Sequence, residues 1–79
     1  MKITNKTKVN LEIMTRILKP NESGYYPEKQ FNILHVHSEV GSCIITSEYG
    51  ERRFKSYGKL YAKGYGKDNK GNIIIVAIN

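Results

Sequence analysis

The feature that most constrains the fold of this chain is a stretch of fifteen residues, 53–67, in which two kinds of side chain alternate. The even positions carry small or apolar residues such as Phe54, Gly58 and Leu60, whereas the odd positions carry only basic residues and tyrosines. A β-strand sends successive side chains to opposite faces, while a helix would scatter them around its circumference. The stretch is therefore predicted to be extended, with a bend at Gly58, because glycine tolerates the kinks by which small sheets coil.

The rest of the chain also has the pattern of strands. Apolar residues alternate from Val9 to Ile17, which predicts a single half-buried strand there. A second strand is predicted at Phe31–His37 and an edge strand at Lys2–Thr4. The segment Lys19–Pro27 is predicted to be a loop, because two prolines and a glycine interrupt any regular ladder.

Three short polar segments end in glycine and predict hairpin turns: Ser38–Gly41, Ser47–Gly50 and Asp68–Gly71. Each fits a type I turn followed by glycine in the left-handed conformation, which is a common three-residue hairpin loop. This geometry places Val36 opposite Ile44 across the first turn. With all three turns built this way, nine apolar residues share one core face: Leu34, Val36, Ile44, Phe54, Leu60, Ala62, Ile74, Val76 and Ile78.

These elements predict the fold class. The chain is expected to be all-β, as a small antiparallel barrel or a two-layer sandwich built on a four-stranded meander from Phe31 to Ile78. The strand Val9–Ile17 is expected to cover its core. At 79 residues the chain has room for one thin-cored domain, so residues 1–79 are predicted to form a single small β domain.

Charge and cysteine content narrow the class of protein. The net charge is +6, and residues 51–70 hold seven cations against two acids. Such a concentration of positive charge attracts polyanions, or it simply keeps a sheet soluble.

Cys43 is the single cysteine and cannot form an internal disulfide, which favours a reducing compartment. No apolar run approaches the length of a membrane span, and the first ten residues lack the apolar core of a signal peptide. The expected location is therefore cytoplasmic, without a membrane.

The alternating stretch predicts a binding surface. Tyrosine rings can stack on bases while neighbouring cations contact phosphates, as in single-strand binders that use one sheet face. The hypothesis favours single-stranded DNA or RNA over duplex. The predicted nucleic-acid-binding residues are Arg53, Lys55, Tyr57, Lys59, Tyr61, Lys63, Tyr65, His35 and His37.

A second interpretation is a protein-interaction module. The predicted registers place Tyr65 against Ile75 and bring Phe31, Ile33 and Ile45 onto the same face, so that apolar islands lie within a basic rim. Interfaces between proteins often combine such anchors with a polar rim. The chain would then be an adaptor or inhibitor that docks on an acidic partner, or a homodimer or homo-oligomeric structural subunit. A third interpretation is an ordinary solvated strand.

Metal binding and catalysis have weaker signals. The predicted hairpin places Cys43 opposite His37, with His35 on the same face and Glu39 in the turn. This spacing matches no specific zinc motif, and Lys55 beside it opposes a divalent cation. A thiol–imidazole pair would also need a cleft and an oxyanion site, and the sequence indicates neither. No metal, no cofactor and no enzymatic activity are predicted.

Overall fold

The protein is an all-β sandwich in a computed structural model that describes residues 1–27, 33–48, 51–65 and 72–77. The described strands are β1 (Lys2–Asn5), β2 (Leu11–Ile13), β3 (Arg16–Leu18), β4 (Ser23–Tyr25), β5 (Ile33–Ser38), β6 (Gly41–Glu48), β7 (Glu51–Gly58), β8 (Leu60–Tyr65) and β9 (Asn72–Ala77). In these ranges no helix is long and apolar enough to cross a membrane.

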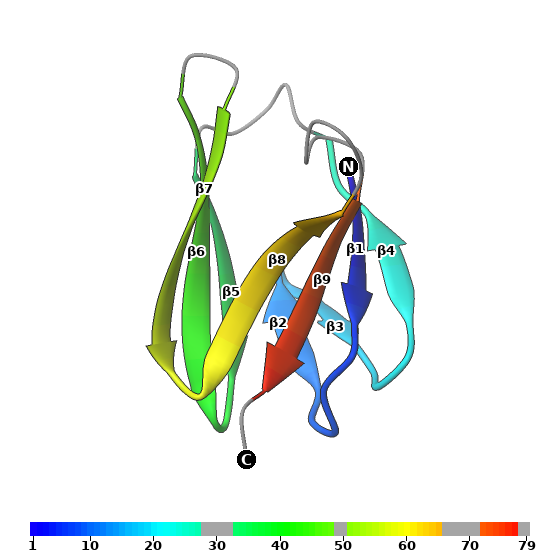
Figure 1. Ribbon diagram of the computed structural model, residues 1–79. Coiled ribbons are helices and arrows are strands. Elements are labelled where there is room, and N and C mark those ends of the chain that lie inside the picture. The colour runs from blue at the N-terminus through cyan, green and yellow to red at the C-terminus, as the bar shows by residue number, and fades with distance from the viewer. Residues whose placement is uncertain (28–32, 49–50, 66–71, 78–79) are drawn as a thin grey trace.

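The strands form two sheets that face each other (Figure 1). The four-stranded sheet has the order β4-β1-β9-β8, and the five-stranded sheet has the order β3-β2-β5-β6-β7. The pairing of β1 with β9 is parallel, and all other pairs are antiparallel. Of the two predicted architectures, the structure is the two-layer sandwich, because no strand pairing between described residues closes the two sheets into a barrel.

The predicted bend at Gly58 is confirmed, and it divides the meander between the two sheets. Gly58 has a φ of 67°, β7 ends there, and β8 begins two residues later in the other sheet. At this corner the Lys59 amide donates a hydrogen bond to the Val40 carbonyl at 3.1 Å. Gly41 pairs with Gly58, and a Cβ on Gly41 would lie only 2.3 Å from the Tyr57 carbonyl oxygen. Two glycines therefore allow the backbones to meet where the chain changes sheet.

The single strand predicted over Val9–Ile17 is wrong. β2 and β3 form a tight hairpin whose turn residues, Met14 and Thr15, have φ values of 52° and 64°. The hairpin extends the five-stranded sheet at its edge through the pairing of β2 with β5, and its buried residues Leu11, Ile13 and Leu18 contribute to the core. Asparagine and glycine are the usual residues at such positions, and Thr15 is β-branched, so no sequence signal marked this turn. The predicted loop Lys19–Pro27 likewise contains a short strand, β4.

The predicted hairpin registers are wrong by an odd number of residues. Ser38 pairs with Gly41, so Gly41 begins the next strand and Val36 lies opposite Cys43 instead of Ile44. The β8–β9 ladder is shifted as well, with Tyr65 opposite Asn72 instead of Ile75. An odd shift moves side chains to the other face of a sheet. The loop glycines of the two later predicted turns, Gly50 and Gly71, lie outside the described residues.

The shift exchanges several apolar residues between core and surface. Twelve buried residues form the core: Ile3, Leu11, Ile13, Leu18, Tyr26, Leu34, Val36, Cys43, Ile45, Leu60, Ile73 and Ile75. Of the predicted core, Leu34, Val36 and Leu60 are buried, while Phe54 and Ala62 pack against the core at its edge. The predicted core residues Ile44, Ile74 and Val76 lie instead on the outward-facing positions of their strands and are only partly buried, and Ile78 is outside the described residues.

A fully buried asparagine links the two sheets near the end of β1. The side-chain nitrogen of Asn5 donates to the carbonyl oxygens of Val9 and Leu18, each at 2.8 Å. Its side-chain oxygen accepts from the Thr7 backbone amide at 2.9 Å and from the Thr7 hydroxyl at 2.6 Å. Both amide protons and both oxygen lone pairs are thus used, which satisfies a polar group with no exposed surface.

Candidate nucleic-acid interface

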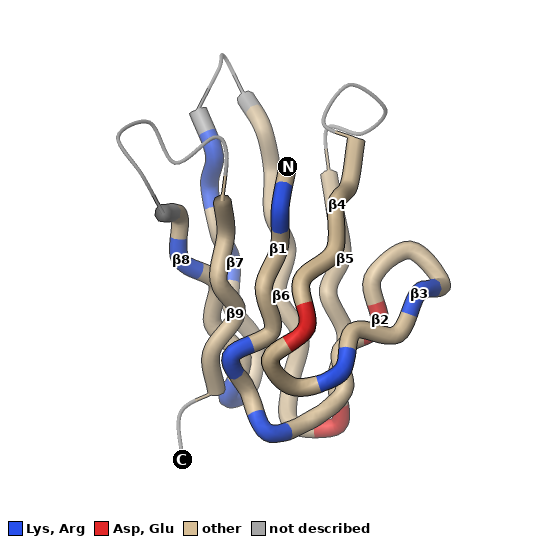
Figure 2. The backbone as a smooth tube through the Cα atoms, turned by 90° about the vertical axis from the view of Figure 1, so that its right-hand side faces the viewer, with Lys and Arg blue, Asp and Glu red and all other residues tan. Residues whose placement is uncertain are grey.

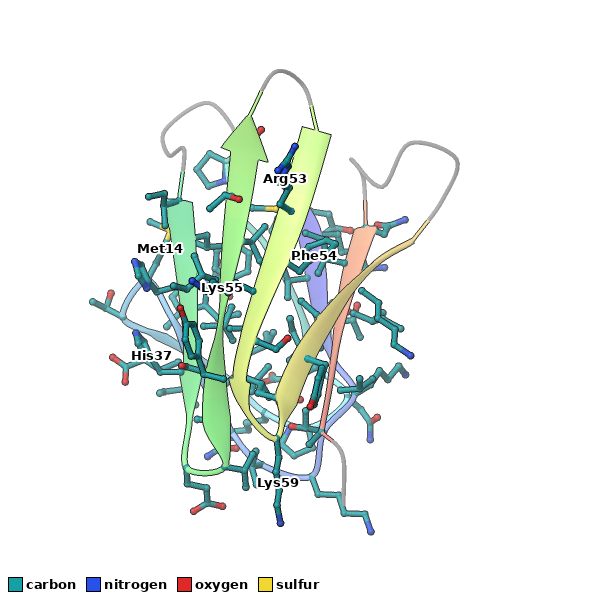
Figure 3. All side chains as sticks on the ribbon, turned by 60° about the vertical axis from the view of Figure 1, so that its left-hand side comes forward. Met14, His37, Arg53, Phe54, Lys55 and Lys59 are labelled. Atoms are coloured by element: carbon teal, nitrogen blue, oxygen red, sulfur yellow. The ribbon has the colours of Figure 1, made fainter. Side chains whose placement is uncertain are left out.

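The predicted ladder of tyrosines and cations is divided between two outward faces. Arg53, Lys55 and Tyr57 lie on β7 and are exposed on the five-stranded sheet. Tyr61 and Lys63 lie on β8 and are exposed on the four-stranded sheet. The remaining members are Lys59, which is exposed at the bend and points away from both strands (Figure 3), and Tyr65, whose side chain is outside the described set.

The two predicted histidines share the outer face of the five-stranded sheet with the β7 residues. Cross-strand pairing arranges this face in three rows: Ile33–Thr46–Arg53, His35–Ile44–Lys55 and His37–Ser42–Tyr57. The exposed side chains of β5 and β7 therefore flank the partly buried side chains of β6. Of the nine predicted residues, five are brought together here: His35, His37, Arg53, Lys55 and Tyr57.

Most of these side chains line a shallow groove of about 450 Å³, called here the outer groove, and His37 and Ser42 lie next to it on the same face. It is lined by Ile33, His35, Ile44, Thr46, Arg53, Phe54, Lys55 and Tyr57. Among the residues that the structure describes, none that lines the outer groove is acidic. The groove therefore offers cations and flat rings on a partly apolar floor.

The rings of the outer face are already arranged for stacking. The imidazoles of His35 and His37 are parallel within 4°, with centroids 5.9 Å apart. The Lys55 ammonium lies 5.7 Å from the centroid of the Tyr57 ring, which is 43% exposed. Figure 3 shows Lys55 and His37 projecting from the same face of the sheet. Aromatic surface and positive charge thus lie together on one face of the sheet.

The predicted pairing of Cys43 with His37 is wrong. Cys43 lies opposite Val36 and is completely buried, whereas His37 lies opposite Ser42 on the outer face. The thiol and the imidazole therefore point to opposite sides of the sheet. Within the described residues, no group of three histidine, cysteine or acidic side chains is placed to hold a metal ion.

Cys43 is expected to resist alkylation in the native protein. Burial raises the pKa of its thiol to about 12, so only about one thiol in ten thousand would be ionised at about pH 8. We expect iodoacetamide to modify Cys43 in urea but not in native buffer, as measured by mass spectrometry. Because the folded protein holds this proton more tightly than the unfolded chain, stability should also fall between about pH 9 and pH 12. Equal modification rates in both buffers would contradict this assignment.

Exposed apolar residues also lie on the outer face of the five-stranded sheet and at its β2–β3 edge. Ile33 is 53% exposed on β5, and Ile17 is 55% exposed on β3. Met14 is also exposed at the tip of the β2–β3 hairpin. The islands predicted at Ile45 and Ile75 are instead part of the core, because of the shifted registers, and Phe31 lies outside the described residues.

The outer face of the four-stranded sheet carries cations that the sequence interpretation missed. Lys2 on β1 and Lys6 just after it share this face with Lys63 on β8. Figure 2 shows basic positions on β1, on β8 and in the loop that follows β1. The local alternation marked β8, but only the parallel pairing of β1 with β9 brings residues 2–6 into the same sheet, with β9 between them and β8.

Comparison of the chain with known protein families, with curated proteins and with solved structures gave no match in any of the three. The function is therefore inferred from the two faces themselves.

Proposed function

We propose that the protein binds single-stranded nucleic acid in the outer groove of the five-stranded sheet. The observation that carries this proposal is the juxtaposition of the exposed Tyr57 ring and the parallel imidazoles of His35 and His37 with the Lys55 ammonium. The rings supply surfaces on which bases stack, and the ammonium lies where the phosphate of a stacked nucleotide would pass. The proposal does not extend to an enzymatic reaction.

The form of the groove favours a single strand over a duplex. Base faces are accessible only when the bases are unpaired, and stacking on an aromatic side chain contributes about 1–3 kcal/mol per base. A sheet face with two ring sites on separate strands, β5 and β7, can engage successive bases. Recognition would depend weakly on sequence, because every base has a stacking face.

The test is fluorescence anisotropy of labelled single-stranded DNA and RNA at about 50 mM and about 200 mM salt. Tyr57→Ala should weaken binding about 5-fold to 100-fold through lost stacking. Lys55→Glu should weaken it further and reduce its salt dependence, because one phosphate contact and its counterion release are lost. The matched control is Lys19→Glu, an equal charge change at an exposed position between β3 and β4.

Three results would contradict the proposal. They are an absence of binding at the lower salt concentration, equal losses for Lys55→Glu and Lys19→Glu, and tighter binding of a duplex of the same length. The second result would indicate that net charge alone attracts the polymer, with no defined site.

Exposed apolar residues support a second candidate, a protein-interaction module. Ile17 on the edge strand β3 and Ile33 on β5 are each more than half exposed, and Met14 is exposed in the β2–β3 turn of the same sheet. The positive net charge would favour an acidic partner. Light scattering distinguishes a self-associating form: a dimer that Ile17→Asp converts to a monomer would support this candidate.

A further inference from the structure

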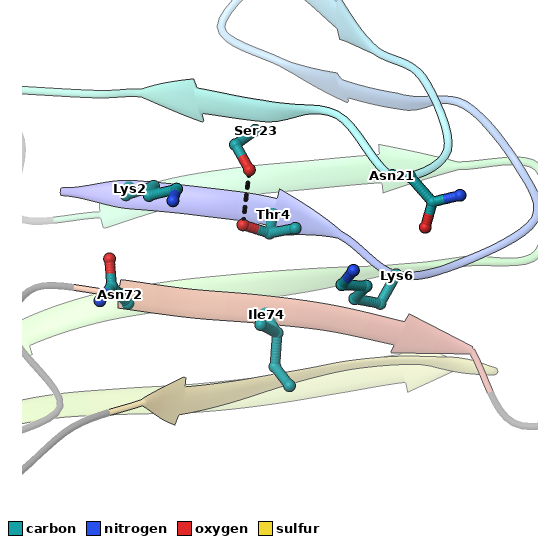
Figure 4. A pocket seen from close by; sticks show the side chains of 7 residues that line it. All are labelled: Lys2, Thr4, Lys6, Asn21, Ser23, Asn72 and Ile74. Atoms are coloured by element: carbon teal, nitrogen blue, oxygen red, sulfur yellow. Dashed lines mark hydrogen bonds between the residues drawn. The ribbon is translucent and has the colours of Figure 1, made fainter.

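A second groove lies on the outer face of the four-stranded sheet, across the sandwich from the outer groove. It encloses about 480 Å³ and is called here the lysine–amide groove. It is lined by Lys2, Thr4, Lys6, Asn21, Ser23, Asn72 and Ile74 (Figure 4). These residues come from β1, β4, β9 and the segments next to them, so three strands and a loop build one site.

The lining is rich in hydrogen-bond donors and poor in negative charge. Lys2 and Lys6 supply two ammonium groups, and Asn21 and Asn72 supply two carboxamides. Among the described residues that line the groove none is acidic, and within that part of the chain neither lysine has an ionic partner. Two uncompensated cations in one concave site attract an anion.

The hydroxyl groups of the groove are also arranged for a ligand. Thr4 and Ser23 lie opposite each other on β1 and β4, and their hydroxyl oxygens are 2.8 Å apart. One hydroxyl donates to the other, which leaves the proton of the second free to donate outward. The pair therefore presents a directed donor at the middle of the groove (Figure 4).

The groove is preformed at its Asn21 end. Asn21 has a φ of 67°, and its backbone amide donates to the Asn5 carbonyl at 2.7 Å. The backbone amide of Asn5 in turn donates to the Glu22 carbonyl at 2.9 Å. Asn5 is the buried residue that links the two sheets, so the backbone beside Asn21 is held by the core. A preformed site loses less conformational entropy on binding.

From this donor set we propose that the lysine–amide groove binds a phosphate ester carried on a hydroxylated unit such as ribose. A phosphate group offers three strong acceptor oxygens and up to two negative charges, which match two ammonium groups and a hydroxyl donor. The carboxamides suit the hydroxyl groups of the carrier, because each can both donate and accept. The volume is within the range of small-ligand sites. No aromatic residue lines the groove among those described, so base stacking is not its role.

This chemistry has two possible sources, a free sugar phosphate or the backbone of a nucleic acid. The proposal stands independently of binding at the outer groove, because the two grooves are on opposite sheets. Residue-resolved NMR distinguishes binding at the two grooves. Changes in the backbone amide chemical shifts of residues 2–6, 23 and 72–74 report the lysine–amide groove, and changes at residues 35, 37, 55 and 57 report the outer groove.

The experiment is a ¹H–¹⁵N NMR titration with ribose 5-phosphate, with ribose alone and with a single-stranded oligonucleotide. Ribose 5-phosphate should give saturable shifts around the lysine–amide groove at millimolar concentration, and ribose alone should give none. Shifts there with the oligonucleotide as well would identify the nucleic-acid backbone as a source, whereas shifts with ribose 5-phosphate only would identify a free ligand.

Variants test the assignment of the contacts. Lys2→Gln and Lys6→Gln should each weaken ribose 5-phosphate about tenfold, and Thr4→Val should weaken it less while keeping the strand intact. Lys19→Gln is the control of equal charge and should leave the affinity unchanged. Absence of saturable shifts at about 10 mM, or an equal effect of Lys19→Gln, would overturn the inference. Shifts confined to the outer groove would overturn it and leave the proposed function standing.

Discussion

Replacing Asn5 by alanine is expected to lower the free energy of unfolding by about 3–5 kcal/mol. The substitution removes four hydrogen bonds, to the carbonyls of Val9 and Leu18 and from the amide and hydroxyl of Thr7. A buried polar group left without a partner costs about 1–3 kcal/mol. In the variant the single proton of the Thr7 hydroxyl can turn to the Val9 carbonyl, 2.9 Å away, so the loss falls mainly on Leu18 and on the Thr7 amide. Stabilities of small domains are about 5–15 kcal/mol, so the variant should be close to unfolded.

Urea denaturation followed by circular dichroism measures this loss. Asn10→Ala, at an exposed position five residues away, is the matched control and should change stability by less than about 0.5 kcal/mol. Asn5→Asp adds a sharper test, because its carboxylate would face the carbonyl oxygens of Val9 and Leu18. That carboxyl should be least destabilising when protonated, so the deficit relative to the parent should shrink as pH falls toward about 4. A loss below about 1 kcal/mol for Asn5→Ala would show that Asn5 does not link the sheets.

Gly41→Ala is expected to be about as damaging, at about 3–5 kcal/mol. Its Cβ would lie 2.3 Å from the Tyr57 carbonyl oxygen and 2.9 Å from the Lys59 amide nitrogen. Both atoms belong to backbone that is held by pairing with Gly58 and by the hydrogen bond from Lys59 to Val40. The overlap can be relieved only by moving β7 away from β6 at the corner. Thermal unfolding should show the loss as a lowered Tm.

Two companion variants define the cause of that loss. Gly58→Ala should also destabilise, because its Cβ would lie 2.8 Å from the Val40 carbonyl oxygen and its φ of 67° suits glycine. Ser56→Ala, at an exposed position on the same strand, should be nearly neutral. A Gly41→Ala variant as stable as Ser56→Ala would mean that the corner opens freely in solution.

The fold class could be predicted from the sequence because the decisive signal is local. Alternation over residues 53–67 defined β7 and β8, and Gly58 marked the bend between them. The register could not be predicted, because a single residue decides it. The sequence pattern predicts Gly41 as the last residue of the turn. In the structure Gly41 is the first residue of β6, at a point where no Cβ fits. The β2–β3 turn could not be predicted either, because Met14 and Thr15 are poor residues for its conformation.

The candidate site was partly predictable for the same reason. Four of the predicted residues alternate along their own strands: His35, His37, Lys55 and Tyr57. Strands β5 and β7 both flank β6, and the odd register errors on its two sides cancel. The prediction that β5 and β7 share an outer face is therefore confirmed. The lysine–amide groove depends on contacts between residues far apart in the chain. Lys2 and Asn72 face each other only through the parallel β1–β9 pair, which no local pattern indicates.

The parallel β1–β9 pair also sets the order in which this chain can be completed during synthesis. β1 precedes the other described strands in the chain and β9 follows them, so the centre of the four-stranded sheet stays open until β9 emerges. Until then β1 has only β4 beside it, and an unpaired strand edge is exposed. Contacts between such distant segments slow folding. The open edge also has the geometry to accept β9 of a neighbouring nascent chain, so we expect strand exchange between copies to be a route of misfolding for this topology.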